Sequence, residues 1–183
     1  MGVIDKAVSW AVSIADDDSH EYSQSTRWGP HYDCSSFVIT AYTNAGVDVK
    51  GAGASYTGDM YTPFINKGFK NVTSSCKLSN GEGLKKGDVL LSSGHHAALV
   101  RADGGAIVHA SSPKKGICCQ GYYNYPWDFV LRYQDNSGGS DGQGSGAAKT
   151  EEYMYSENSY EETKKEPSVV WNNRTAESAH AKL

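Results

Sequence analysis

The chain has 183 residues, of which 38% are hydrophobic and 21% are charged, and its formal net charge is −4 at pH 7. These values are typical of a globular protein with one domain of ordinary size and an additional segment. The negative charge argues against nucleic acid as a partner, because phosphate binding requires a basic surface. The apolar runs are too short to cross a bilayer, so no interaction with a membrane is expected.

The N-terminal segment MGVIDKAVSWAVSIADDD predicts an amphipathic helix. Its apolar residues recur every three or four positions, which is the spacing of one helix face. The stripe consists of Ile4, Ala7, Val8, Ala11, Val12 and Ala15. The segment lacks the basic start and the continuous apolar core of a secretory signal, so we expect synthesis without a signal peptide.

A second helix is predicted over residues 35–45, within and just after the stretch YDCSSFVITAY, and Gly46 is expected to end it. Cys34 lies at the beginning of this helix, where Ser35 and Ser36 can cap the first turn. A helix N-terminus and a nearby imidazolium lower the pKa of a thiol, and the backbone N–H groups there can bind an oxyanion. Taken alone, however, a cysteine at this position is more often a buried apolar side chain.

The remaining elements are predicted to be strands. GDVLLSS begins a strand after a turn, HHAALVRADGGAIVHASS has the pattern of a β-hairpin, and PWDFVLRY indicates a final strand. Two helices followed by antiparallel strands indicate an α+β fold.

The hairpin contains three histidines, which strand parity separates. If its turn has four residues, Arg101 opposes Ala106, and the numbers of opposed residues sum to 207. His109 then lies one diagonal step from His96 on the same sheet face, close enough for a hydrogen bond, whereas His95 points to the other face. A two-residue turn at the two glycines would instead move the histidines apart.

A thiol, an imidazole base and a polar residue that orients the base form the catalytic arrangement of thiol hydrolases. Cys34, His96 and His109 match these three roles, and the small residues Ala97 and Ala98 leave space for the helix that carries Cys34. A thiolate–imidazolium pair supplies both nucleophile and acid, so we expect neither a metal ion nor a cofactor.

Four ordered blocks, YDCSSFV, GDVLL, HHAALV and AIVHAS, resemble the D-C-S-x-x-V, G-D-[LV], H-[VTA]-[GA]-[ILM]-Y and I-x-H-A blocks of NlpC-type cell-wall cysteine peptidases. The ending YYNYPWDFVLRY is similar to that of the catalytic domains of bacteriophage endolysins. The resemblance covers nearly all of residues 1–134. It implies a papain-like α+β fold, in which N-terminal helices pack on an antiparallel sheet and the catalytic cysteine begins a helix.

The resemblance also implies a peptidoglycan hydrolase that cleaves an amide bond of the stem peptide. The family's nucleophile corresponds to Cys34, its base to His96 and its third polar member to His109. The pair HH departs from the single histidine of the family, and both parity and the family blocks favour His96 over His95.

Three further residues are expected to bind substrate, namely Tyr22, Asp33 and Ser35. Tyr22 corresponds loosely to the tyrosine that lines the family's active site. Asp33 corresponds to the acid that lines its substrate groove, although a role in capping the helix is equally compatible with its position.

Several alternatives remain open at this stage. An endopeptidase that cuts within the stem peptide is favoured, but an N-acetylmuramoyl-L-alanine amidase would use the same residues. The domain could also be a wall-binding module without turnover, or an acyltransferase on the same scaffold.

Residues 1–135 are interpreted as the catalytic domain. Residues 136–183 contain the Gly/Ser-rich run SGGSDGQGSG from Ser137 onward and carry eight acidic and five basic residues. They are interpreted as a tether and a disordered acidic tail. We expect a monomer, or an assembly with a wall-targeting subunit. We also expect synthesis in the cytoplasm of the host bacterium and action on the cell wall after release.

Overall fold

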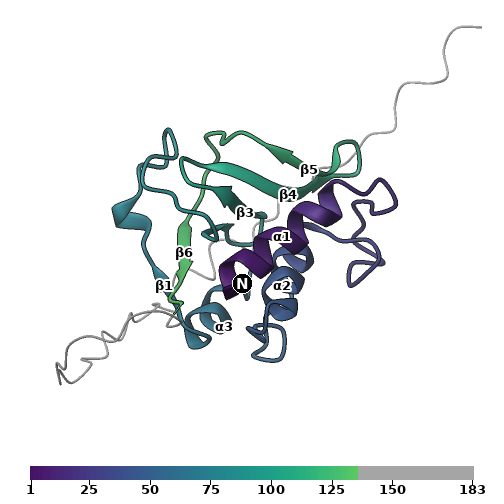
Figure 1. The fold of residues 1–183 in the computed structure, drawn as a ribbon, viewed down its shortest axis with the longest axis horizontal. Helices are drawn as coiled ribbons and strands as arrows, with labels where there is room; N and C mark the ends of the chain where they lie inside the picture. The colour runs from purple at the N-terminus through teal and green to yellow at the C-terminus, as the bar shows by residue number, and fades with distance from the viewer. Residues whose placement is uncertain (136–183) are drawn as a thin grey trace, which may run out of the picture. The chain divides into compact units, whose positions relative to one another are not determined.

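Two helices near the N-terminus lie side by side against one face of an antiparallel sheet (Figure 1). The structure is a computed structural model that describes residues 1–135, so the predicted tether and tail at 136–183 lie outside the described residues. Helix α1 spans Val3–Ala15 and helix α2 spans Cys34–Asn44. A shorter helix, α3, spans Tyr61–Asn66.

The sheet has six strands in the order β1-β6-β2-β3-β4-β5, and every neighbouring pair is antiparallel. The strands are β1 (Phe69–Asn71), β2 (Val89–Ser92), β3 (His96–Ala102), β4 (Ala106–Ser112), β5 (Gly116–Gln120) and β6 (Phe129–Tyr133), with a 3-10 turn, η1, at Thr73–Ser75. The predicted α+β class is therefore confirmed.

The predicted helices form because each has an apolar face to bury. In α1, Ala7, Val8 and Ala11 are buried, and Trp10 packs edge-on against Tyr32, with ring centroids 5.5 Å apart. Helix α2 is buried along most of its length because α1 covers it on one side and the sheet on another. Gly46 follows it with φ of +101°, a left-handed conformation that glycine adopts without strain.

Successive side chains of the central strands point to opposite faces of the sheet and pack into two separate cores. Leu91, Ala97, Leu99, Val108 and Ala110 pack with the helices, whereas Leu90, Ala98, Val100, Ile107 and Trp127 form a second cluster on the opposite face. His96 and His109 have the parity of this second cluster. The histidines consequently lie on the sheet face that points away from α1 and α2.

The predicted hairpin register is correct over its paired part and wrong at its turn. Leu99 opposes Val108 and Val100 opposes Ile107, so the numbers sum to 207 as expected. Beyond them a β-bulge shifts the register, and Ala106 pairs with Ala102 rather than with Arg101. The extra residue in the bulge changes the pairing near the turn but leaves the histidine end unaffected.

The GD pair that precedes β2 has a structural explanation. Gly87 has φ of +88°, and a Cβ atom there would lie 2.6 Å from Ile4 of α1. Asp88 is fully buried, forms an ion pair with Arg132 at 2.7 Å, and accepts a hydrogen bond from the backbone N–H of Lys85. These contacts join the start of β2 to α1 and β6.

Candidate active site

Cys34 is the first residue of α2, and the residue before it caps the helix. The Asp33 side chain accepts a hydrogen bond from the backbone N–H of Ser36 at 2.8 Å, and the Ser36 hydroxyl accepts one from the backbone N–H of Asp33 at 3.0 Å. This reciprocal capping box satisfies two N–H groups at the helix start. The capping role considered for Asp33 is therefore present.

The Cys34 side chain is 9% exposed, and burial raises the pKa of its thiol. The backbone N–H groups of Ala97, Ser35 and Cys34 itself act in the opposite direction, and the charge of Asp33 raises the pKa further. The expected lowering of the pKa by the helix start is thus outweighed by desolvation. The raised pKa favours the neutral thiol at pH 7.

The contact with Ala97 shows where the sulfur lies on the sheet. The backbone N–H of Val100 donates to Asp88 ahead of β2, so by alternation the N–H of Ala97 points toward β4. In the described part of the chain the paired positions of β3 and β4 begin only at Leu99, so Ala97 lies beyond the paired region. The Cys34 sulfur therefore lies at the end of the hairpin that carries both buried histidines.

His96 and His109 are in direct contact. His96 Nε2 and His109 Nδ1 are 2.8 Å apart, and the side chains are only 8% and 1% exposed. Burial lowers the pKa of both imidazoles to about 4, and in His96 the neighbouring His109 adds to the effect. Both rings are consequently neutral at pH 7, so one proton lies between these two nitrogens.

The second ring nitrogen of His96, Nδ1, forms no hydrogen bond within residues 1–135. Within residues 1–135, the Cys34 sulfur likewise forms no hydrogen bond with the imidazole of His96 or of His109. The structure thus brings His96 and His109 together directly, and it connects Cys34 to them through the backbone of Ala97. His95 is exposed in the turn between β2 and β3.

An aromatic cluster without a predicted role packs around the two histidines. Trp127 stacks on the His96 ring at a centroid distance of 5.8 Å, and Tyr125 meets the same ring at 5.6 Å. Tyr123 lies 6.0 Å from the His109 ring. Burial raises the pKa of Tyr123 to about 12, and the neighbouring Tyr125, Cys118 and Cys34 add to this shift, so Tyr123 lies near the thiol as well as near His109.

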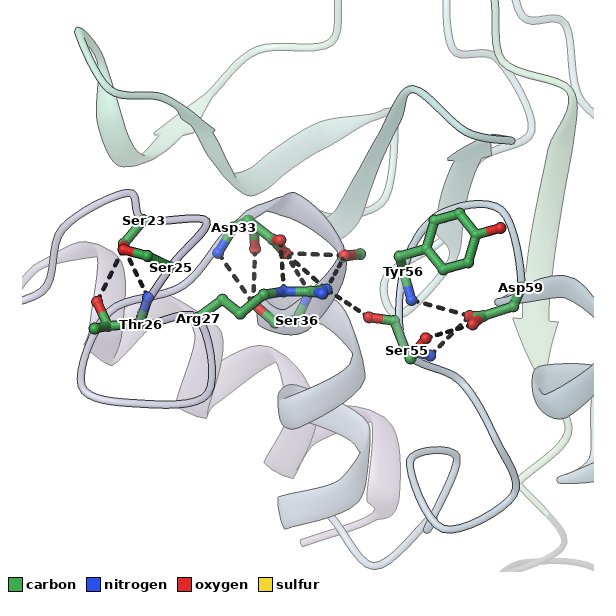
Figure 2. Close-up of polar contacts among 10 residues, drawn as sticks. Ser23, Ser25, Thr26, Arg27, Asp33, Ser36, Ser55, Tyr56 and Asp59 are labelled. Atoms are coloured by element: carbon green, nitrogen blue, oxygen red, sulfur yellow. Dashed lines mark hydrogen bonds and ion pairs between the residues drawn. The ribbon is translucent and has the colours of Figure 1, made fainter. Parts of the chain in front are cut away.

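Arg27 also belongs to the site, although no sequence motif predicts it. Its guanidinium forms an ion pair with Asp33 at 2.6 Å and donates to the Ser35 hydroxyl at 2.7 Å and to the backbone carbonyl of Ser55 at 2.5 Å. Figure 2 shows Arg27 lying between Asp33 and Ser55, whose loop is held in turn by Asp59. Two loops are thereby tied to the start of α2.

The predicted substrate-binding residues lie at the same helix end. Tyr22 forms a β-bridge with Tyr32, and its pKa is raised by burial and then by the charges of Cys34 and Asp33. Ser35 is 2% exposed and donates its hydroxyl proton to Asp33 at 2.9 Å. Tyr22, Asp33 and Ser35 therefore all lie near Cys34, although the oxygens of Asp33 are already occupied by protein donors.

Within residues 1–135, no three His, Cys, Asp or Glu side chains converge as a metal site would require, and no helix is long and apolar enough to span a membrane. The class defined by fold and site is an α+β domain with a helix-start cysteine near a buried histidine pair. Residues 29–107 match the family model of the endolysin-like domain. The matched range includes Cys34 and His96 and ends two residues before His109.

This similarity supports a relationship to phage endolysins and indicates a cell-wall lytic function, with peptidoglycan as the substrate that it implies. A comparison with curated proteins finds no match to the chain.

Proposed function

We propose that the domain is a cysteine-dependent peptidoglycan hydrolase that cleaves an amide bond of the stem peptide. The observation that carries this proposal is the buried His96–His109 pair at the end of the hairpin, next to the backbone N–H that contacts the Cys34 sulfur. The similarity to the endolysin-like domain supports the choice of substrate.

In the first step, His96 acts as general base. Because thiol and imidazole are both neutral at rest, proton transfer accompanies nucleophilic attack. His96 Nδ1 takes the thiol proton as the sulfur–carbon bond forms, and the carbonyl oxygen gains the negative charge. The backbone N–H groups of Cys34 and Ser35, which point from the helix start, stabilise this oxyanion.

In the second step, the protonated His96 acts as general acid. It gives its proton to the amide nitrogen as the carbon–nitrogen bond breaks, which leaves a thioester on Cys34. A water molecule then attacks the thioester carbonyl while His96 accepts a proton from it. The sulfur–carbon bond breaks, the carboxylic acid product leaves, and His96 returns the proton to the Cys34 sulfur. His109 acts through His96, because it holds that imidazole in the required orientation and tautomer.

The substrate-facing residues are proposed from their positions around the thiol. Tyr22 would contact the substrate beside Cys34, and Ser35 and Asp33, which are hydrogen-bonded to one another, would support the helix start next to it. The Asp33 carboxylate is held by Arg27, so we propose that it acts on substrate chiefly by positioning the helix start.

We favour an endopeptidase, with N-acetylmuramoyl-L-alanine amidase activity as the alternative. We further propose that the protein works as a monomer or with a wall-targeting subunit, and that it acts on the wall after release from the host cytoplasm.

The test is digestion of purified cell walls of several chemotypes, followed by mass spectrometry of the released fragments. A new end within the stem peptide is expected. A new lactyl end on the amino sugar would establish the amidase instead, and no new end with any wall would contradict the hydrolase proposal. The Cys34→Ala variant provides the blank for each digest.

A further inference from the structure

The two histidines constrain one another's protons. For His96 to accept the thiol proton at Nδ1, its own proton must reside on Nε2 and be donated to His109 Nδ1 across the 2.8 Å contact. A neutral imidazole has one N–H group, so His109 must then carry its proton on Nε2. The mechanism therefore requires an acceptor for His109 Nε2–H.

His109 Nε2 is buried and makes no hydrogen bond of good geometry among the described residues, although the Gln120 side chain is near enough to the ring to raise its pKa as a hydrogen-bonding group. A buried polar atom without a partner is costly and calls for an explanation. His96 lies on β3, on one side of β4. Strand β5 lies on the other side of β4, where a partner for His109 Nε2 is expected. In its register Gln120 opposes Ile107, so Gln120 is a diagonal neighbour of His109 on the same sheet face.

The other polar groups near His109 are poor acceptors. Cys118 opposes it directly on β5, but a thiol accepts hydrogen bonds only weakly. Lys115 acts on His109 from the β4–β5 turn as a cation, and an ammonium can only donate. Tyr123 meets the ring of His109 as an aromatic neighbour. The amide oxygen of Gln120 is the strong acceptor of this group.

We propose that the Gln120 side chain accepts a hydrogen bond from His109 Nε2–H and thereby sets the tautomers of both His109 and His96. Gln120 is thus a positioning residue, and the inference rests on the proposed function, in which His96 is the base. Rotation of the terminal amide, whose torsion is soft, completes the bond. Gln120 raises the pKa of His109, whereas burial lowers it, and this agrees with an amide oxygen that faces the ring.

The test is two-bond ¹H–¹⁵N correlation spectroscopy of the ¹⁵N-histidine-labelled full chain at neutral pH, with kcat/KM measured on purified walls. In the wild type, His96 and His109 are both expected as Nε2–H tautomers. In Gln120→Leu, His109 is expected to become a mixture of tautomers, with a loss in kcat/KM of about tenfold or more. Gln134→Leu, which removes a glutamine that directly follows β6, is the control and should change neither the tautomers nor kcat/KM.

A wild-type His109 protonated on Nδ1, or tautomers unaltered in Gln120→Leu, would overturn the proposal. If Gln120→Leu does not fold, Gln120→Glu decides, because a carboxylate acceptor should keep the Nε2–H tautomer and raise the pH at which His109 titrates. An unshifted titration in Gln120→Glu would equally overturn it. The spectra do not depend on turnover, so loss of the hydrolase proposal through an active Cys34→Ala variant would leave this result standing.

Discussion

His96 Nε2 and His109 Nδ1 lie 2.8 Å apart on neighbouring strands, in a pair that is almost completely buried. This contact makes the two imidazoles one chemical unit, because the proton between them determines which nitrogen of His96 is left as the base. It also explains why both remain neutral at physiological pH, since protonation would bury a charge.

Replacing the two adjacent histidines of β3 and its turn should have very different effects. His96→Ala removes the base and is expected to lower kcat/KM on purified walls by roughly 10²–10⁴-fold. His95→Ala, a matched substitution at an exposed turn position, should be close to wild type. Dye release from labelled walls measures both. The reverse order would mean that the wrong histidine has been identified as the base.

The buried pair predicts a pH dependence of stability. Histidine in the unfolded chain titrates near pH 6.5, whereas these imidazoles titrate at about 4. Between these values the unfolded chain binds protons that the folded chain does not. The contribution of the neutral imidazoles to the free energy of unfolding is therefore present in full above pH 6.5. It is lost as the pH falls toward 4, by on the order of 3 kcal/mol for one imidazole.

Urea denaturation at pH values between 7.5 and 5 tests this prediction in a window where most carboxylates stay ionised. The double variant His96→Gln/His109→Gln should lose less of its free energy of unfolding over this range than the wild type. Equal losses in the two proteins would show that the histidines do not carry the effect.

The pH dependence of Cys34 alkylation should be that of a neutral thiol. Burial raises its pKa, so alkylation by iodoacetamide is expected to be slow at neutral pH and to accelerate up to and beyond pH 9. Peptide mass spectrometry follows Cys34 separately from Cys76, Cys118 and Cys119, which are also free thiols. A rate that is already at its plateau between about pH 5 and 8 would instead indicate a resting thiolate–imidazolium pair.

Arg27 should matter for stability as well as for activity. Arg27→Met removes the partner of a carboxylate that is 7% exposed, and is expected to cost about 3 kcal/mol of the free energy of unfolding. It should also slow wall hydrolysis, because Asp33 and Ser35 set the start of α2.

Lys86→Met is the matched control for this substitution. Lys86 pairs with Asp5 at 2.5 Å, but both side chains are well exposed, so its loss should leave stability nearly unchanged. Equal destabilisation by the two variants would argue against a special role for the Arg27 network.

Residue patterns that repeat over a few positions predict the helices and the strand faces from the sequence alone. The apolar stripe of the first helix and the parity of His96 and His109 follow from local spacing, which is why the histidine contact was predicted together with its register. The capping position of Asp33 is likewise a local feature.

Features that depend on long-range contacts carry no local sequence signal. Strand β5 has no sequence signal, because GICCQ lacks polar–apolar alternation and only Ile117 in it is buried. No motif marks Arg27, because only the fold brings its partners Asp33, Ser35 and Ser55 together. The raised pKa of the Cys34 thiol comes from burial, which a helix start does not reveal. The run YYNYPW offered a signal for the aromatic cluster around His96, since three of its members contact the histidine rings.

The most direct test of the account is the release of new amino termini from purified cell walls by wild-type protein, Cys34→Ala and Cys76→Ala at equal concentration. We predict that Cys34→Ala remains folded and releases none above background, whereas Cys76→Ala matches the wild type. Release by Cys34→Ala of more than a few percent of the wild-type amount would contradict the assignment of Cys34 as the nucleophile.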